Sequence, residues 1–265
     1  IRGKLAVMKR DELAKVLTER ELESLEFGYR ERVTDMDLPH IRDLPQVLPG
    51  LFSDAALRAQ EAGFDGIELH YAHAYTMASF LSRKNTRDDG YGGSLENRTR
   101  FSRRIIEGIR HACGEDFVVG LAVSYSDAHP VLPGIEQLAE IVALHDATGH
   151  VDYVTVGHGG YLDFERLMPT FLFGEKLTAP VTEVLKGVLK HAVVTSEAHI
   201  RTPENAEAII ASGQADLVSI VRGQIADPHL ARKTTEGRAE DVRGCISCNQ
   251  MCWGRRSRDY WISCV

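Results

Sequence analysis

Helical and strand-like patterns alternate along the chain from about residue 53 to residue 220. Short apolar runs rich in β-branched residues are separated by longer segments in which apolar positions recur at helical spacing. The expected strands are 66–69, 117–123, 153–156, 193–195 and 216–220, and the expected helices between them are 95–113, 135–148, 180–190 and 203–212. This alternation predicts a parallel α/β sheet built around one core.

The first 50 residues carry weaker patterns. Residues 11–32 are highly charged with leucines at helical spacing, which predicts one or two surface helices, and Thr18 with Glu21 forms a capping box. Three prolines within residues 37–50 predict an extended loop, followed by a helix from about Ser53.

Polar side chains that suit chemistry follow the first predicted strand at once. His70, Tyr71, His73 and Tyr75 come directly after the buried strand predicted at 66–69. Parallel α/β enzymes place their chemistry at the carboxyl ends of strands. Structural hydrogen bonding explains any one of these residues, but four together favour a functional rim.

Composition and charge exclude several classes of protein. The chain is 43% hydrophobic and 26% charged, and its net charge of −7 argues against nucleic acid and anionic membrane surfaces as partners. No apolar run approaches the roughly 20 residues of a membrane span. The chain begins IRGKLAVMKR without Met, so we expect a fragment of a longer protein.

Four of the five cysteines lie close to the C-terminus. Their spacing, Cys245-x2-Cys248-x3-Cys252-x11-Cys264, differs from that of a secreted disulfide scaffold and indicates a reducing, cytoplasmic location. The first three thiols are close enough in sequence to converge on one centre. Four thiolates suit either tetrahedral zinc or an iron–sulfur cluster, and spacing alone leaves the two open.

Three segments together resemble the old yellow enzyme superfamily (NADH:flavin oxidoreductases). They are AGFDGIELHYAHAY with RDDGYGGSLENR, GQADLVSIVRGQIADPHLARK, and CISCNQMC. The resemblance is to the iron–sulfur branch that includes 2,4-dienoyl-CoA reductase and trimethylamine dehydrogenase. It implies a TIM (β/α)8 barrel of the FMN-linked oxidoreductase type. The five strands would then be the fourth to the eighth, so the barrel is expected to be truncated at its N-terminal side.

The resemblance also implies roles for the rim residues. His70 and His73 are similar to the family's pair that hydrogen-bonds a substrate oxygen or polarises an amine, and Tyr75 is similar to its proton-transferring tyrosine. Asp163 lies near the position of a further active-site acid or histidine. Imidazole and phenol groups can stabilise or neutralise the charge that a hydride transfer leaves on a substrate.

For the cofactor, Arg222 resembles the arginine that binds the flavin phosphate, beside the loops after the last two strands. The sequence departs from the family pattern nearby. Ala198-His199 stands where Gly-Arg or Gly-Gly is usual, Val221 replaces a small residue, and Ala122 stands in place of an arginine that contacts the flavin ring.

At the C-terminus, the resemblance favours a 4Fe–4S cluster over zinc as the occupant of the four cysteines. Arginines surround the motif, and positive charge near an anionic cluster raises its potential. They are Arg243, Arg255, Arg256 and Arg258. A solvated basic face is the alternative explanation for them.

The resulting hypothesis is an FMN- and 4Fe–4S-dependent oxidoreductase that exchanges hydride between flavin and a small-molecule substrate. Two substrate classes remain open: an activated C=C that is reduced, and an N-methyl amine that is oxidatively demethylated. NAD(P)H or an electron-transfer partner would be the redox partner, and a C-terminal flavin or nucleotide domain is expected in the full-length protein. The oligomeric state stays open, a homo-oligomer included.

This hypothesis divides the chain into three parts: a charged lead-in at 1–50, a partial FMN-binding barrel at 51–240, and a cluster segment at 241–265. The alternative is a non-catalytic partial barrel with a structural zinc site, which would bind partners through its open sheet edge.

Overall fold

The computed structural model describes residues 8–27 and 31–265, and the chain divides into two compact units, Ile1–Leu44 and Pro45–Val265. The first unit contains the short helices α2 (Arg10–Leu13), α3 (Glu19–Phe27) and α4 (Pro39–Arg42). The capping box is confirmed, because the Glu21 carboxylate accepts hydrogen bonds from the backbone N–H and the hydroxyl of Thr18 at 2.7 and 2.8 Å. Part of the predicted helical region, residues 28–30, lies outside the described residues.

The extended loop predicted for residues 37–50 is wrong. Helix α5 spans Leu44–Glu61 and begins nine residues before the expected start at Ser53. Proline is tolerated in a first helical turn because the N–H that it lacks would have no partner there, and Pro39 and Pro45 occupy such positions. Pro49 lies inside α5, where only one backbone hydrogen bond is given up.

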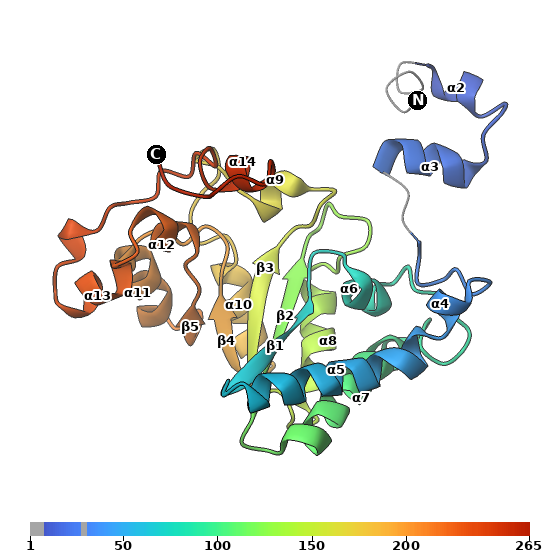
Figure 1. Ribbon diagram of the computed structural model, residues 1–265, viewed down its shortest axis with the longest axis horizontal. Helices are drawn as coiled ribbons and strands as arrows, with labels where there is room; N and C mark the ends of the chain where they lie inside the picture. Colours follow the sequence, from blue (N-terminus) through green and yellow to red (C-terminus); the bar gives the residue numbers. More distant parts are fainter. Residues whose placement is uncertain (1–7, 28–30) are drawn as a thin grey trace. The chain divides into compact units, whose positions relative to one another are not determined.

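Five parallel strands form one sheet in chain order, which confirms the predicted α/β class. The strands are β1 (Gly66–Tyr71), β2 (Val118–Tyr125), β3 (Tyr153–His158), β4 (Val193–Ser196) and β5 (Leu217–Val218). All five point toward the end of the sheet at which α9 and α14 lie (Figure 1). The carboxyl ends of the strands therefore lie together at one edge, under the C-terminal segment.

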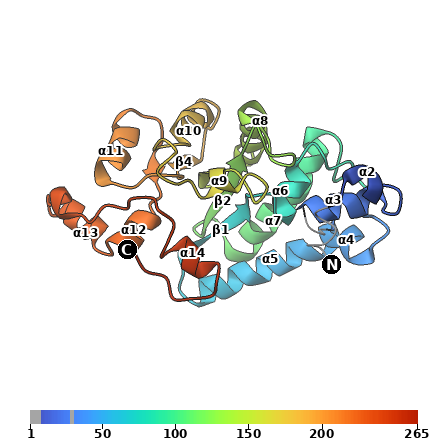
Figure 2. The same cartoon turned by 90° about the horizontal axis from the view of Figure 1, so that it is seen from above.

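The helices between the strands cover the outer side of the sheet. They are α6 (Thr76–Leu81), α7 (Leu95–Cys113), α8 (Ile135–Asp146), α10 (Ala179–Lys186) and α11 (Pro203–Ala211). Helices α7, α8 and α10 pack side by side in chain order (Figure 2). The limits of the predicted helices are confirmed to within a few residues.

Helix α7 shows why these predictions succeed. Ser94 caps its first turn by accepting a hydrogen bond from the N–H of Asn97 at 3.2 Å, and Gly114, with φ of 86°, ends it in a conformation that favours glycine. Phe101, Ile105 and Ile109 recur on one face and are fully buried. Each such side chain stabilises the fold by roughly 1.5–3 kcal/mol.

Strands β1 to β4 all end later than the apolar pattern predicts, with β2 ending at Tyr125 and β4 at Ser196, whereas β5 is shorter than the predicted 216–220. Strand β1 continues to Tyr71, so His70 and Tyr71 belong to the strand instead of following it. Strand β3 continues to His158. Strand β1 is also half-buried instead of fully buried, since Leu69 and Tyr71 face the core while Glu68 and His70 are exposed on the other face.

Beyond the sheet the chain forms short elements that the sequence pattern did not predict. They are α9 (Phe164–Leu167), α12 (Arg222–Ala226), α13 (Leu230–Thr235), the 3-10 helix η1 (Ala239–Asp241) and α14 (Trp253–Arg256). Each is too short to produce a clear periodic pattern. None of the helices in the described part of the chain is long and apolar enough to cross a membrane.

Candidate functional site

Three of the predicted rim residues are neighbours in space. The ring centroid of His70 lies 5.4 Å from that of His73 and 5.4 Å from that of Tyr75. His70 is in β1, whereas His73 and Tyr75 lie in the turn between β1 and α6, with Tyr75 as the N-cap of α6. The strand end and the tight turn therefore bring the two imidazoles and the phenol together, as the sequence predicts.

His73 is held in one orientation by the neighbouring strands. Its backbone N–H donates to the Ser124 hydroxyl at 2.7 Å, and its Nδ1 donates to the Gly159 carbonyl at 2.9 Å. A carbonyl only accepts, so the neutral ring keeps Nε2 as an acceptor. Burial lowers the pKa of His73, partly offset by the Gly159 carbonyl, and the neutral ring is therefore favoured at pH 7.

Tyr75 begins a row of aromatic rings that reaches the C-terminal segment. Its hydroxyl donates to the hydroxyl of Tyr161 at 2.9 Å. Tyr161 lies 6.0 Å from Phe164 of α9 between ring centroids, and Phe164 lies 5.2 Å from Trp253 of α14. Tyr161 thus links the rim to the segment that carries the cysteines.

Asp163 is buried next to this row. One carboxylate oxygen accepts from the Ser126 hydroxyl at 2.5 Å and the other from the Gly160 N–H at 2.6 Å. These bonds fix the loop after β3. The charge of Asp163 also favours the protonated form of His73. Its role as an active-site acid stays a prediction.

A cavity of about 240 Å³ opens beside the rim, at the carboxyl ends of β3, β4 and β5. Its lining combines the rim with the predicted phosphate site. Of the described rim residues, His73 lines the cavity, together with Ala198, His199 and Arg222. The sequence assigned these residues to one cofactor and substrate site, and the fold brings them around one space.

The turn after β4 has a backbone conformation that suits the glycine of the family pattern better than the Ala198-His199 of this chain. Ala198 and His199 have φ of 69° and 64°, in the left-handed region that favours glycine. His73 and Ala74 in the turn after β1 have the same conformation, with φ of 57° and 61°. Such backbone strain concentrates at binding and active sites, and here three of the strained residues, His73, Ala198 and His199, line the cavity.

Arg222 lies between this cavity and the cysteines. Its Nη1 donates to the Pro169 carbonyl at 2.7 Å and to Asn249 Oδ1 at 2.6 Å. Burial lowers the pKa of Arg222, and the thiols of Cys245, Cys252 and Cys248 oppose that shift. The guanidinium group is thus partly buried and shared by two sites.

Ala122 lies within β2 and supplies no cation. It is buried in β2 and pairs with His70 in the register of β1 and β2. Its methyl group supplies no hydrogen-bond donor. Whether it lies against a flavin ring stays a prediction.

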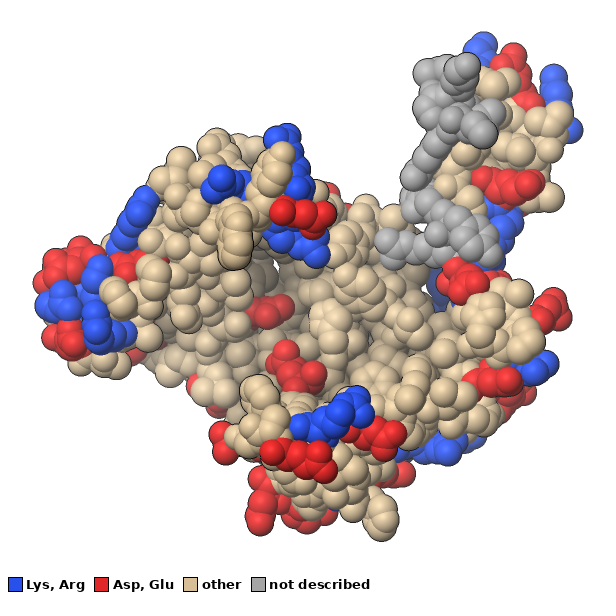
Figure 3. Space-filling view, viewed as in Figure 1, with Lys and Arg blue, Asp and Glu red and all other residues tan. Residues whose placement is uncertain are grey.

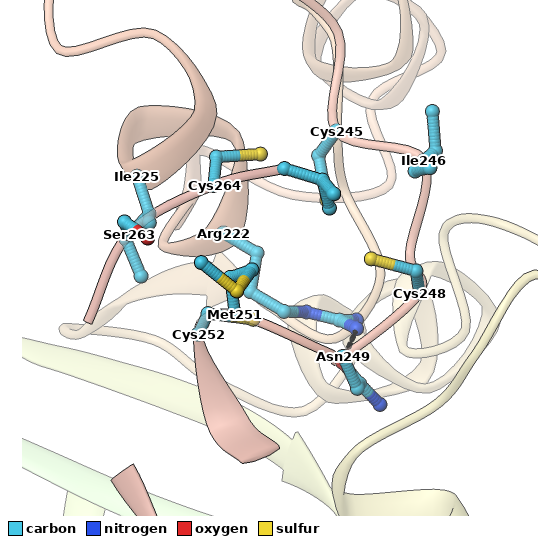
Figure 4. Close-up of a pocket in the computed structure, with 11 residues that line it drawn as sticks. Arg222, Ile225, Cys245, Ile246, Cys248, Asn249, Met251, Cys252, Ser263 and Cys264 are labelled. Atoms are coloured by element: carbon cyan, nitrogen blue, oxygen red, sulfur yellow. Dashed lines mark hydrogen bonds between the residues drawn. The ribbon is translucent and has the colours of Figure 1, made fainter. Parts of the chain in front are cut away.

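All four C-terminal cysteines line a second, small cavity together with Arg222 and Asn249. Figure 4 shows the sulfur atoms of Cys248 and Cys264 directed into the space between them, while the Arg222 side chain extends to Asn249. Within residues 8–27 and 31–265, no three His, Cys, Asp or Glu side chains gather closely enough to bind one metal ion. The described thiols therefore share a cavity without meeting at a single point.

Side chains hold the cysteine segment to the strand loops. Arg201 donates to the Cys245 carbonyl at 2.9 Å, and Ser247 donates to Nε2 of His199 at 2.7 Å. Asn249 donates to the Met168 carbonyl at 2.9 Å. Lys and Arg side chains gather over this C-terminal segment, while acidic side chains lie in the hollow over the sheet (Figure 3).

Sequence reasoning missed two residues of the larger cavity, His158 and Glu197. Both stand at the carboxyl end of an apolar strand, β3 and β4, and that position was the available signal. The ring of His158 stacks on Tyr125 at 4.5 Å, with an angle of 3° between the planes. Burial raises the pKa of Glu197 to about 7.

Comparison with known proteins identifies the fold. Residues 36–241 match the model of the NADH:flavin oxidoreductase / NADH oxidase family. A solved 2-naphthoyl-CoA reductase in complex with 2-naphthoyl-CoA superimposes with a TM-score of 0.76 at 29% identity, covering 83% of this chain and 33% of that chain. A histamine dehydrogenase from Rhizobium sp. 4-9 gives 0.75 at 30% identity, covering 83% and 32%. The five strands are thus part of a TIM barrel of the FMN-linked oxidoreductase type.

Relatives with known activities agree with this assignment. An NADH oxidase of Thermoanaerobacter brockii is 42% identical over 209 residues, which cover 77% of this chain and 31% of the relative. An N,N-dimethylglycine/sarcosine dehydrogenase of Chromohalobacter salexigens is 33% identical over 218 residues, covering 81% and 31%. The chain spans about a third of the length of these relatives. The chain belongs to the NADH:flavin oxidoreductase / NADH oxidase family.

Proposed function

We propose that this chain supplies the catalytic part of an FMN- and 4Fe–4S-dependent oxidoreductase that exchanges hydride between flavin and a small substrate. The observation that carries the proposal is the cavity of about 240 Å³, which His73 and Arg222 line together. His73, which suits a substrate, and Arg222, which suits a phosphate, thus line the same cavity.

The donor set at one side of this cavity fits the phosphate of FMN. Arg222 is a partly buried cation, and the left-handed turn of Ala198 and His199 lies beside it. Charge-assisted hydrogen bonds from a guanidinium group to a phosphate are among the strongest in proteins. When bound, FMN would supply the hydride chemistry, while the residues of this chain hold the substrate and move its proton.

The four cysteines fit the ligand set of a 4Fe–4S cluster. A cubane is bound by four thiolates on four different iron atoms, so the thiols need a shared cavity and not a common point. Cys245, Cys248, Cys252 and Cys264 line such a cavity, and the Arg222 cation beside it offsets negative charge. The aromatic row from Tyr75 to Trp253 lies between the rim and this segment.

Of the two substrate classes, the state of His73 favours an amine. Its Nδ1 hydrogen is used by the Gly159 carbonyl, and the neutral ring offers Nε2 as an acceptor, which suits the N–H of an alkylammonium group. An enone oxygen needs a donor instead, and His70 and Tyr75 are the rim residues that remain for that role. Tyr75 would transfer the substrate proton in either case.

Arg222 gives the direct test of the flavin site. Replacing Arg222 with Ala should weaken FMN binding by about 1–3 kcal/mol, the scale for losing a charge-assisted hydrogen bond. The measurement is a fluorescence titration of FMN into the full-length apoprotein. Arg232→Ala, which removes an exposed arginine from α13, is the matched control and should leave the affinity unchanged. Equal FMN affinity in wild type and Arg222→Ala would contradict this phosphate site.

A further inference from the structure

Glu197 occupies an unusual place in the larger cavity. It follows the last residue of β4 and directly precedes Ala198 and His199 of the proposed phosphate turn. A Cβ atom built on Gly157 of β3 would lie 2.6 Å from a Glu197 carboxyl oxygen and 3.1 Å from His73 Cε1. The carboxyl group of Glu197 and the ring of His73 therefore approach the same point on the neighbouring strand.

Two polar groups in this part of the cavity have no hydrogen-bond partner among the residues that the structure describes. Among the described residues, no hydrogen bond or ion pair reaches the carboxyl group of Glu197. The Thr178 hydroxyl donates instead to the backbone carbonyl of Glu197. In the described part of the chain, Nδ1 of His158 also has no hydrogen-bond partner, and it is buried, in agreement with the 8% exposure of the residue. Buried polar groups are nearly always hydrogen-bonded, so unpartnered groups around a cavity point to a ligand.

The charges around Glu197 do not neutralise it. Glu68 of β1 adds a second carboxylate, and Ala122 of β2 supplies no cation. Burial lowers the pKa values of His73, His158 and His199, so these rings are neutral above pH 7. The remaining charged groups of the cavity are the guanidinium groups of Arg201 and Arg222, which pair with Glu175 and with Pro169 and Asn249, respectively.

We propose that Glu197 takes up a proton when flavin binds in this cavity, so that flavin affinity falls as the pH rises. The inference rests on the proposed FMN site. FMN carries a negatively charged phosphate, and an ionised carboxylate in the same partly buried space repels it. A neutral carboxyl group removes that repulsion and can donate a hydrogen bond to the ligand.

The sign of the pH dependence follows from linkage. The pKa of Glu197 is raised to about 7 by burial, with Glu68 as a smaller cause, and negative charge on the ligand raises it further. Below pH 7 the group is protonated with or without ligand, so the affinity is constant. Above pH 7 only the complex keeps the proton, and the affinity falls by up to tenfold for each pH unit until the complex also ionises.

The test is a titration of FMN into the full-length apoprotein at pH 6, 7, 8 and 9. The second ionisation of the FMN phosphate lies near pH 6, so it is complete over most of this range. Wild type should lose roughly tenfold in affinity between pH 7 and pH 9. Glu197→Gln, which is neutral at every pH, should change by less than about twofold, and Glu207→Gln, which removes an exposed carboxylate from α11, should behave as wild type.

Proton uptake gives a second readout that does not depend on activity. Calorimetry at pH 8 in two buffers of different ionisation enthalpy should detect roughly 0.7 proton bound per FMN in wild type and none in Glu197→Gln. FMN binding with a flat pH profile and no proton uptake in wild type would overturn this inference and leave the flavin site intact. Failure of wild type and Glu197→Gln to bind FMN at any of the four pH values would overturn both.

Discussion

The rim at the end of β1 and the cysteine segment, residues 241–265, are positioned in different ways. His70 lies within a strand, and its place follows from the parallel register that pairs it with Ala122. The cysteine segment contains no strand within the described residues, and its longest regular element is the four-residue α14. Side chains of the strand loops, such as Arg201 and His199, hold it instead.

We infer that the fold alone sets the position of the rim, whereas the cysteine segment needs its ligand. Strand register is fixed by the whole hydrophobic core, so the rim residues stay together without help from a bound group. A segment held by a few side-chain hydrogen bonds, each worth about 1 kcal/mol, is easily rearranged. We expect the cluster to order the cysteine segment, because ligand binding to such a segment contributes folding energy.

The largest effect should come from breaking the cysteine side. The proposed cluster predicts about four irons per chain in anaerobically prepared full-length protein, and Cys248→Ser should abolish iron binding because a cubane needs its four thiolates. Iron and zinc analysis with the visible absorbance spectrum is the measurement. Cys113→Ser is the matched control, since Cys113 ends α7 and does not line the cavity.

A contrary result would favour the rival hypothesis. Stoichiometric zinc without iron, in protein prepared without oxygen, would identify a structural zinc site. The flavin would then have to exchange electrons with a redox partner without a cluster in this segment.

The next effect concerns the rim. Tyr75→Phe should slow turnover by roughly 10²- to 10⁴-fold, the scale of general acid–base catalysis, while FMN stays bound. Steady-state kinetics on N-methyl amines and on enones measure it. Tyr91→Phe is the control. The Tyr91 hydroxyl accepts a hydrogen bond of 2.6 Å from Arg104 and does not belong to the rim. A change of less than about twofold on every substrate would exclude Tyr75 as the proton-transferring residue.

The sequence predicts the sheet well because its strands and helices carry strong periodic patterns. Helix α7 is predicted to the residue, since its cap, its apolar face and its final glycine all agree. Helix α5 is missed at its start, because Pro45 and Pro49 read as loop signals although helix packing overrides them. Strand β1 is predicted too short, because exposed residues such as His70 break the apolar run on one face.

The sequence predicts which residues form the candidate site better than it predicts the contacts between them. Resemblance brought His73 and Arg222 into one site, and the structure places both on one cavity. The link from Arg222 to Asn249 joins residues 27 positions apart, and no local pattern indicates such a contact. Glu197 was missed for a related reason, since its surroundings include Gly157 of β3 and Glu68 of β1, which are distant in sequence.

The smallest effect separates the two roles of Arg222, which lines both the cysteine cavity and the larger cavity. Asn249→Ala removes the acceptor of Arg222 on the cysteine side and the donor to the Met168 carbonyl, but leaves the Pro169 carbonyl in place. Iron loss to a chelator should become about five- to tenfold faster, the scale of roughly one lost hydrogen bond. FMN affinity should change by less than about twofold, because the guanidinium group stays in the cavity. If FMN affinity instead fell as far as in Arg222→Ala, Asn249 would be needed to orient Arg222 toward the phosphate, and the rim and the cysteine segment would act as one site.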